Sequence, residues 1–147
     1  MELSCKIAVN ASKEKIWPYY TDSSLFAIWE EDLESIVYNG EIKTGTTGKM
    51  KLAGMPEIPF TLSEVIENAS YCDRSDIPGV GSLFFDHKIL NENGTTYIRH
   101  SVRLEKDKFT EEDMEFLNGV FNDVPKSMMI IKREVEKSEV PIGRIPI

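Results

Sequence analysis

The two histidines of this chain are the residues best suited to acid–base chemistry or to anchoring a polar group of a ligand. His87 and His100 both fall in the segment from Ser82 to Glu105, on either side of the dipeptide Asn93-Gly94. That dipeptide favours a two-residue type I′ turn, which predicts a β-hairpin. The register set by such a turn places His87 directly opposite His100 on one face of the hairpin.

The hydrophobic pattern of the hairpin supports this register. With a two-residue turn, the face of the histidines also carries the apolar pairs Ile89/Ile98, Phe85/Val102 and Leu83/Leu104. The opposite face carries Lys88/Arg99, Asp86/Ser101 and Phe84/Arg103. A turn longer by one residue would place His87 opposite Arg99 and mix the two faces. We therefore expect two adjacent histidines in an apolar sheet face, which is typical of a pocket with one polar spot.

Several interpretations of this histidine pair are compatible with the sequence. The imidazoles could contact a carbonyl or hydroxyl of a ligand, or act as a general acid and base, because histidine titrates near neutrality. Alternatively, they are hydrogen-bonded to each other or to water beneath a covering helix. A metal site would need a third ligand, which Glu64 could supply if its strand points inward. We expect neither a metal nor a cofactor.

Length, composition and charge limit the class of protein. A chain of 147 residues fits one domain, and its 41% hydrophobic residues are enough for a sizeable core. The net charge of −8 and the acidic flanks of Lys132-Arg133, the densest basic cluster, argue against nucleic-acid binding. No segment approaches the run of about 20 apolar residues that a membrane span needs, so no membrane insertion is expected.

The two cysteines and the first residues indicate the cellular compartment. The N-terminal segment has neither a long apolar run nor a cleavage site, so we expect no signal peptide. Cys5 and Cys72 are isolated in the sequence and match no metal-binding spacing. Without a secretory signal, reduced cysteines and a cytoplasmic location are the expectation.

Alternation of apolar and polar residues predicts strands through the first two thirds of the chain. The first strand carries Leu3, Cys5, Ile7 and Val9 at alternate positions. After two short helices, strand patterns separated by turn residues occur at 33–38, 49–52, 60–67 and 71–75, followed by the histidine hairpin. Successive strands joined by short turns predict an antiparallel meander.

Helical patterns occur after the first strand and at the end of the chain. Ser12 and Asp22 or Ser23 can cap two short helices, and Pro18 is expected to end or kink the first. Thr110 with Asp113 resembles a capping box. Apolar residues then follow at steps of three and four in one continuous stripe: Met114, Leu117, Phe121, Val124, Met128, Ile131 and Val135. This stripe predicts a long amphipathic helix, kinked at Pro125.

These elements together predict an α+β fold. A curved antiparallel sheet of about six to seven strands has one apolar face that must be covered, and only the C-terminal helix is long enough to cover it. A curved sheet wrapped around a long C-terminal helix leaves a cavity between them. We expect a single domain over residues 1–138, followed by a C-terminal tail over residues 139–147.

The order of elements resembles the START-like (SRPBCC) superfamily, which includes birch-pollen-allergen-like proteins and the polyketide cyclase/dehydrase and lipid transport group. The pattern Ile16-Trp17-x-x-Tyr20-Thr21-Asp22-x-x-x-Phe26-x-x-Trp29 is similar to the helix pair of that family. Gly45-x-x-Gly48 before a strand and Gly94-Thr95 at the start of the last strand are similar as well. The resemblance implies a helix-grip fold with a pocket for lipids, polyketides, sterols or plant hormones. Catalytic residues vary within the family, so none is carried over.

The main functional hypothesis is the binding of a small hydrophobic molecule between the sheet and the C-terminal helix. Its expected contacts are the polar anchors His87 and His100 and the apolar walls Phe85, Ile98, Val102, Met114, Leu117, Phe121, Met128 and Trp29. The first alternative is a cyclase/dehydratase-type enzyme using the histidines as acid and base. The second is a co-chaperone-like interaction protein that uses the apolar tail after Val140, and a homodimer is a further partner hypothesis.

Overall fold

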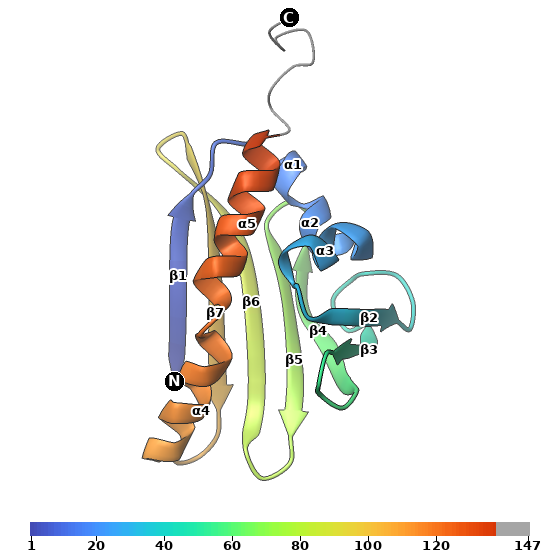
Figure 1. Cartoon of the computed structure of the whole chain (residues 1–147), viewed down its shortest axis with the longest axis vertical. Helices are drawn as coiled ribbons and strands as arrows, with labels where there is room; N and C mark the ends of the chain where they lie inside the picture. The colour runs from blue at the N-terminus through green and yellow to red at the C-terminus, as the bar shows by residue number, and fades with distance from the viewer. Residues whose placement is uncertain (138–147) are drawn as a thin grey trace, which may run out of the picture.

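The structure, a computed structural model, describes residues 1–137. One strand is followed by three short helices, then by six consecutive strands, and the chain continues with two helices (Figure 1). In chain order they are β1 (Glu2–Ala8), α1 (Lys13–Ile16), α2 (Pro18–Thr21), α3 (Ser23–Trp29), β2 (Leu33–Tyr38), β3 (Thr47–Leu52), β4 (Ile58–Ile66), β5 (Ser70–Ile77), β6 (Gly81–Glu92), β7 (Thr95–Glu105), α4 (Glu111–Phe121) and α5 (Val124–Lys137).

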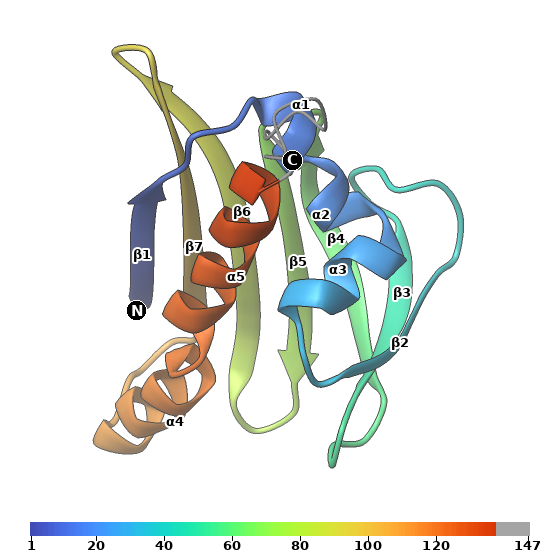
Figure 2. The same cartoon turned by 45° about the horizontal axis from the view of Figure 1, so that its top comes forward.

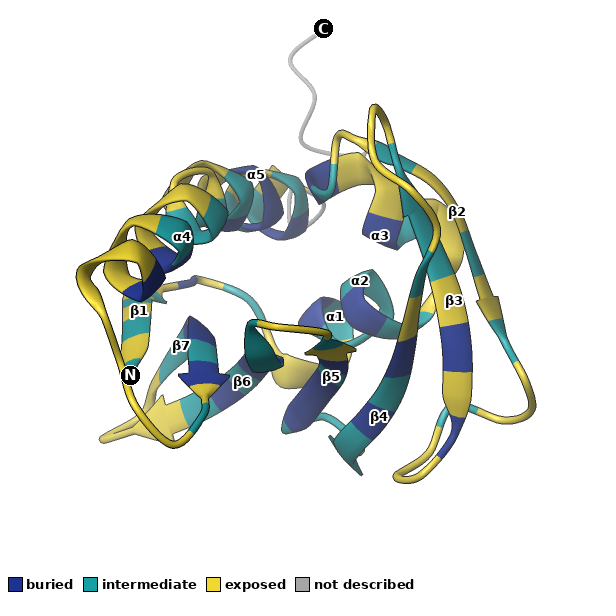
Figure 3. Ribbon diagram, turned by 90° about the horizontal axis from the view of Figure 1, so that it is seen from below, coloured by how far each residue is buried: buried dark blue, intermediate teal, exposed yellow. Residues whose placement is uncertain are grey.

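The seven strands form one antiparallel sheet in the order β1-β7-β6-β5-β4-β3-β2. The sheet curves around the helices, and we call the side that faces them the concave face (Figure 3). Helices α4 and α5 contact β1 and β7, whereas α3 lies in front of β4 and β5 (Figures 1 and 2). This is the α+β helix-grip architecture that the sequence predicts.

The predicted register of the histidine hairpin is confirmed. Strands β6 and β7 pair His87 with His100 across the ladder, and Glu92 with Thr95 next to the turn. Asn93 and Gly94 both have positive φ values, 52° and 84°, as a type I′ turn requires. The sequence therefore placed both histidines correctly on one face of the sheet.

The segment after β1 forms three short helices where the sequence predicted two. The side chain of Ser12 caps α1 and that of Asp22 caps α3, as expected. Pro18 ends the first helix after Ile16 and becomes the first residue of α2, where its missing N–H removes no helical hydrogen bond. These caps hold Tyr20 of α2 and Trp29 of α3 over the sheet, where both are buried.

The C-terminal helical segment is divided into two helices, α4 and α5, instead of forming one kinked helix. Thr110 and Asp113 form the complete capping box that the sequence predicts. The helix is interrupted at residues 122–123 rather than at Pro125, which is the second residue of α5. Proline is tolerated in the first helical turn because the N–H groups there have no intrahelical partner. The interruption therefore precedes the proline.

Two hydrophobic clusters make up the core between the sheet and the helices. The first cluster lies beneath α2, α3 and α5 and includes Tyr20, Phe26, Trp29, Tyr71, Ile98 and Met128. The second lies beneath α4 and consists of Leu83, Val102, Leu104 and Leu117, with Phe85, Phe116 and Phe121 against it. Within residues 1–137, no helix has the length and apolar character needed to cross a bilayer.

Gly48 is a close-approach position in β3, and an alanine there is expected to destabilise the fold. A Cβ atom on Gly48 would lie 2.5 Å from the carbonyl oxygen of Val37 and 2.6 Å from Cζ of Phe60. We expect Gly48→Ala to lower the free energy of unfolding by about 1–3 kcal/mol, as overpacking does. The matched control is Gly119→Ala in α4, where nothing lies within 4 Å of the new Cβ and a small stabilisation is expected. Urea unfolding of both variants measures this; equal effects would contradict the prediction.

Candidate functional site

The two histidines lie side by side on the concave face, beneath α2 and α3. Only 7% of His87 and 4% of His100 is exposed. The ring centroids are 4.7 Å apart, and the rings are nearly perpendicular, at 83°. The sequence thus predicted that the two histidines lie next to each other on one face of the sheet.

The hydrogen-bond partners of the histidines are protein groups that the sequence did not indicate. Nδ1 of His87 lies 2.7 Å from the backbone carbonyl oxygen of Tyr71 and must donate to it. Nε2 of His100 lies 2.7 Å from the hydroxyl of Tyr20. Because the fully buried Tyr20 hydroxyl needs an acceptor, we assign it as the donor to His100. Because the proton of neutral His87 is on Nδ1, its Nε2 carries a lone pair and can accept a hydrogen bond.

Burial makes both histidines neutral at physiological pH. Desolvation lowers the pKa of His87 to about 4, although its bond to the Tyr71 carbonyl and the charge of Asp86 act in the opposite direction. Desolvation also lowers the pKa of His100 well below its usual value, and His87 adds to that effect. Neutral His87 can accept a proton or a hydrogen bond at Nε2, but neither ring carries a charge that would attract an anion.

The contact between Tyr20 and His100 is expected to show strong coupling in a double-mutant cycle. Tyr20→Phe leaves a buried ring nitrogen without its donor, and His100→Phe leaves a buried hydroxyl without its acceptor, so each should cost about 1–3 kcal/mol. The double variant removes both polar groups and should lose less than the sum, with a coupling energy of about 1–2 kcal/mol. Chemical denaturation of the four proteins gives the coupling. Additive losses would contradict this hydrogen bond.

Asp73 is a third titratable residue on the concave face, and the sequence analysis did not identify it. Strand pairing places Asp73 opposite Phe85, two residues before His87, and the side chain is only 6% exposed. Among residues 1–137, no group forms a hydrogen bond or an ion pair with its carboxyl. Desolvation, with the charges of Asp86 and Glu30, raises the pKa of Asp73 to about 8. Asp73 is therefore mostly protonated at pH 7.

A pair of tyrosine hydroxyls and a second acid lie close to Asp73. The hydroxyls of Tyr38 and Tyr71 are 2.6 Å apart, and the pKa of both is raised, mainly by burial and further by the charge of Asp73. Glu30 ends α3, and its pKa is raised to about 7 by burial and by the charges of Asp32, Asp123 and Glu31. The charge of Glu30 adds a further, smaller increase to the pKa of Asp73.

An acidic cleft of about 170 Å³ opens where the end of α3 meets the start of α5. Its walls are Trp29, Glu30, Glu31, Asp32, Asp123, Lys126 and Ser127. Trp29 also borders the histidines, with ring centroids 5.7 Å from His87 and 5.5 Å from His100. The indole of Trp29 therefore separates the acidic cleft from the buried histidine pair.

The predicted apolar walls divide between the two hydrophobic clusters. Trp29, Ile98 and Met128 belong to the first, and Val102 and Leu117 to the second, with Phe85 and Phe121 packed against it. Met114 differs from the expectation of one continuous stripe, because its side chain is 39% exposed and lies in neither cluster. Within α4 the buried residues are Asp113 and Leu117, and Met114 lies outside the face that they mark.

Glu64 does not face the histidines, which excludes the one metal arrangement suggested by the sequence. Its carboxylate pairs with Lys88 and accepts a hydrogen bond from Ser70 at 2.6 Å on the convex face. A register shift between Leu62 and Glu64 sets this orientation. Over residues 1–137, no group of three or more histidine, cysteine or acidic side chains is arranged to hold a metal ion.

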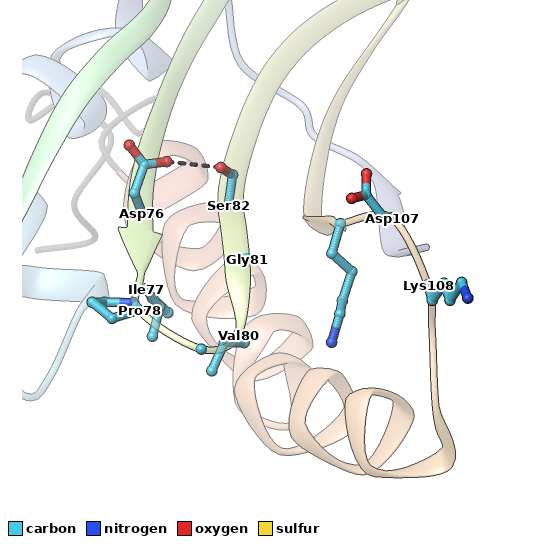
Figure 4. A pocket seen from close by; sticks show the side chains of 10 residues that line it. Asp76, Ile77, Pro78, Val80, Gly81, Ser82, Asp107 and Lys108 are labelled. Carbon is cyan, nitrogen blue, oxygen red and sulfur yellow. Dashed lines mark hydrogen bonds between the residues drawn. The ribbon is translucent and has the colours of Figure 1, made fainter.

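A larger, open cleft of about 760 Å³ lies at the opposite end of the sheet from the β6–β7 turn (Figure 4). It is formed by the turn between β5 and β6 and by residues 106–108, and Asp76 accepts a hydrogen bond from Ser82 within it at 2.8 Å. None of its lining residues is a predicted site residue, so we do not assign the function to it. The C-terminal tail after Val140 lies outside the described residues.

Comparison with solved structures supports the architecture. The protein MLL2253 from Mesorhizobium loti superposes with a TM-score of 0.75 at 10% identity, covering 95% of this chain and 100% of that one. The Aha1 dimer from Colwellia psychrerythraea gives 0.69 at 15% identity, covering 95% and 99%, and Ara h 8.0201 gives 0.68 at 15%, covering 93% and 98%. No protein-family model and no curated protein sequence matches the chain. At these identities the likeness concerns the fold.

Proposed function

Because the chain has the helix-grip fold of the START-like superfamily, we propose that it binds a small, largely apolar molecule between the concave face of the sheet and the C-terminal helix. Proteins of this fold commonly bind hydrophobic ligands. The proposed walls are Trp29, Phe85, Ile98, Val102, Leu117, Phe121 and Met128, with His87 and His100 as polar contacts. Lipid-, polyketide- and sterol-like molecules are the candidate classes.

The observation that carries this proposal is the carboxyl group of Asp73. A buried acid without a hydrogen-bond partner or counter-charge among residues 1–137 destabilises a fold. Such groups are concentrated at functional sites, where a ligand completes the missing interactions. Asp73 lies on the concave face one strand from His87, which is where the fold would hold a ligand. Its position therefore supports a ligand site beside the histidines.

Native mass spectrometry of gently purified protein tests the proposal. We expect a stoichiometric apolar molecule, which solvent extraction then releases for identification. After extraction, thermal unfolding is repeated with a broad set of fatty acids, sterols, aromatic polyketides and long-chain amines, and at least one class should raise the melting temperature. An empty native protein whose stability no compound changes would contradict the proposal.

A second candidate function, acid–base catalysis, is supported by the presence of Asp73 and His87 on the same face of two neighbouring strands. Neutral His87 carries a lone pair at Nε2 and could take a proton beside a ligand carbonyl. Protonated Asp73 could donate a hydrogen bond to the developing oxyanion. The sequence had offered no carboxylate on the face of the histidines, and Asp73 provides one on the neighbouring strand.

Proton exchange on the extracted molecule separates catalysis from binding. The wild-type protein, incubated in deuterium oxide with that molecule, should catalyse incorporation of deuterium beside its carbonyl. His87→Asn keeps a donor for the Tyr71 carbonyl but lacks the base, so exchange should fall at least 100-fold while binding persists. Exchange at the uncatalysed rate in the wild type would rule out this reaction.

We further propose a cytoplasmic location, supported by the free thiols of Cys5 and Cys72, and retain the homodimer as a hypothesis because of the likeness to the Aha1 dimer. Analytical ultracentrifugation distinguishes a monomer from a dimer. The co-chaperone-like alternative depends on the tail after Val140 and stays a prediction. Deleting residues 140–147 should abolish capture of a partner protein without releasing a pocket ligand.

A further inference from the structure

We propose that the ligand carries a neutral hydroxyl group, which donates a hydrogen bond to Nε2 of His87 and accepts one from the carboxyl group of Asp73. This inference rests on the proposed binding function and names the chemical class of its ligand, an apolar alcohol or phenol. The apolar body of the ligand would extend from these two residues along Phe85 toward the second hydrophobic cluster. Fatty acids and ethers fit the same residues less well.

Strand pairing places Asp73 and His87 at diagonal positions on one face of the sheet. Strands β5 and β6 pair Tyr71 with His87 and Asp73 with Phe85, without a register shift. Tyr71 belongs to the first hydrophobic cluster and Phe85 packs against the second, so all four side chains are on the concave face. Diagonal neighbours of this kind have Cβ atoms somewhat less than about 7–8 Å apart. One ligand oxygen can therefore bridge their polar groups.

His87 presents a hydrogen-bond acceptor because the protein fixes its tautomer. Nδ1 donates to the carbonyl oxygen of Tyr71 at 2.7 Å, which leaves the lone pair on Nε2. No group among residues 1–137 donates a hydrogen bond to Nε2. A ligand must bring an O–H or N–H group to satisfy this atom, and neither a ketone nor an ether has one.

Asp73 presents the complementary donor. Its neighbours across the ladder are the apolar Phe85 and Leu62, and no lysine or arginine of residues 1–137 acts on its carboxyl group. Burial raises the pKa of Asp73 to about 8, so the neutral acid with one O–H predominates at pH 7. A ligand carboxylate would meet no counter-charge here, whereas a hydroxyl oxygen can accept from Asp73 while its hydrogen goes to His87.

The unpartnered atoms of His87 and Asp73 are not sealed by the protein. Within residues 1–137, Nε of Arg74 is the one fully covered side-chain nitrogen or oxygen that lacks a hydrogen-bond partner. Nε2 of His87 and the carboxyl oxygens of Asp73 lack a partner as well, so part of their surface is free of protein atoms. Although both residues are more than nine-tenths buried, a ligand atom can therefore reach these groups.

The surrounding rings indicate the side from which the ligand approaches. Tyr20 and Trp29 lie against His87, with ring centroids 5.4 and 5.7 Å from that of the imidazole. They cover the histidine on the side of α2 and α3. Phe85, opposite Asp73, is only half-buried. The apolar body of the ligand is therefore expected to lie along Phe85, with the hydroxyl group at its inner end.

Calorimetry with a matched series of probes tests the inference. 2-Naphthalenemethanol, its methyl ether, 2-methylnaphthalene and 2-naphthoate share one apolar body and differ in the polar group. At pH 7 we expect the alcohol to bind about tenfold tighter than the ether and the hydrocarbon, and naphthoate to bind most weakly. The pair 1-octanol and methyl heptyl ether repeats the comparison with a linear body.

One variant and a matched control locate the hydroxyl group. Asp73→Leu should reduce the affinity for 2-naphthalenemethanol about tenfold and leave that for 2-methylnaphthalene nearly unchanged. Asp76→Leu makes the same exchange on the same strand, at an exposed position of the opposite face, and should change neither affinity. Equal affinity of Asp73→Leu and the wild type for the alcohol would overturn the inference.

Two measurements on the wild type do not depend on the folding of a variant. Ionised Asp73 has no hydrogen to donate, so the affinity for the alcohol should fall about tenfold from pH 7 to pH 9.5, while that for the hydrocarbon stays constant. Nitrogen NMR should show a change of the His87 Nε2 signal with the alcohol but not with the ether. Binding of the alcohol that is independent of pH and leaves this signal unchanged would overturn the inference.

The outcomes separate this inference from the function on which it rests. Equal binding of the alcohol, the ether and the hydrocarbon would overturn recognition of a hydroxyl group but leave a hydrophobic pocket in place. Failure of all probes, together with the absence of a co-purified apolar molecule, would overturn both. A preference for the alcohols that Asp73→Leu abolishes and Asp76→Leu retains supports both.

Discussion

Replacing Asp73 with asparagine is expected to make the protein more stable than the wild type at pH 8, by about 2–4 kcal/mol. Substitutions at positions with only 6% exposure usually destabilise a protein, so the sign of this effect is distinctive. The reason is that the wild-type fold must either hold a proton on Asp73 or bury an uncompensated charge. Asparagine has nearly the same shape and needs neither.

The dependence on pH follows from the raised pKa of Asp73. In the unfolded chain this carboxyl titrates near its usual value of 3.8, and in the folded protein at about 8. Between these values the folded state binds more protons, so its stability falls as the pH rises. For this residue alone the loss from pH 5 to pH 8 is about 3–4 kcal/mol. The stability of Asp73→Asn relative to the wild type should increase by that amount over the same range.

Urea unfolding of both proteins at pH 5, 6, 7 and 8 measures this difference. Part of the gain is offset because the asparagine amide is itself buried without an assigned partner, at a cost of about 1–3 kcal/mol that does not vary with pH. The control is Glu115→Gln, whose exposed position should give a flat difference from the wild type. A difference between Asp73→Asn and the wild type that does not change with pH would show that Asp73 is ionised and compensated in the folded protein.

An acid that destabilises its own fold is consistent with a residue kept for binding. A substitution that stabilises the protein at a ligand site is expected to weaken binding, because the ligand makes the hydrogen bonds that the polar group lacks in the free protein. The stability measurement and the thermal-unfolding screen with ligands therefore address the same carboxyl group by two independent routes. A variant that gains stability and whose melting temperature still rises with the wild-type ligand would show that Asp73 is not needed for binding.

The histidine hairpin was predictable from the sequence because its information is local. The Asn93-Gly94 turn, the length of the loop and the alternation of apolar residues each favour the same register, and the structure has that register. The capping box at Thr110 is local in the same sense. The order of strands and helices then allowed one architecture, since a single apolar sheet face had to be covered.

Asp73 and Tyr20 were not predicted as site residues because their roles depend on contacts between distant segments. Tyr20 meets His100 across 80 positions of the chain. A signal for Asp73 existed in the alternation of β5, where Tyr71, Asp73 and Ser75 share a face. That signal becomes useful only when the pairing of β5 with β6 is known, since it places Tyr71 opposite His87. An acid at an inward position of a strand is the pattern that could have identified it.

The division of the C-terminal helix was missed for a different reason. The apolar residues from Met114 to Val135 fit one helical stripe, and proline in such a stripe predicts a kink at its own position. The structure instead ends α4 at Phe121 and starts α5 at Val124, so that Pro125 occupies the first turn of a new helix. The same apolar pattern is compatible with both arrangements, and packing against β7 and β1 decides between them.

The second large effect is the loss of stability caused by protonation of His87 below pH 7, and it is clearest in a protein that lacks Asp73. In the Asp73→Asn background, adding His87→Asn should improve relative stability by about 3 kcal/mol between pH 7 and pH 4. His87 titrates at about 4 in the folded protein and at 6.5 in the unfolded chain. Between these values the unfolded state binds more protons, so the stability due to neutral His87 is lost as the pH falls.

The Asp73→Asn background removes an effect that opposes that of His87. Acidification from pH 7 to pH 4 stabilises the wild type through Asp73 and destabilises it through His87 and His100, so the acid-side loss is easier to see in the unfolding curves when Asp73 is absent. Burial, the Tyr71 carbonyl and Asp86 set the pKa of His87, and the substitution of Asp73 changes none of these groups, so we expect the same pKa in both backgrounds. Unfolding curves of Asp73→Asn and of Asp73→Asn/His87→Asn at four pH values give the difference directly. The remaining acids contribute equally to both proteins.

An independent measurement reads the charge of the histidine itself. NMR signals of the His87 ring should remain those of a neutral imidazole with hydrogen on Nδ1 down to pH 5, because that hydrogen is held by the Tyr71 carbonyl. Titration of His87 near pH 6.5, or a pH-independent difference between the two variants, would contradict a dry histidine pair and indicate that water reaches the concave face. A neutral ring at pH 5 would instead support a site in which a ligand meets a lone pair at Nε2 of His87 and the carboxyl group of Asp73.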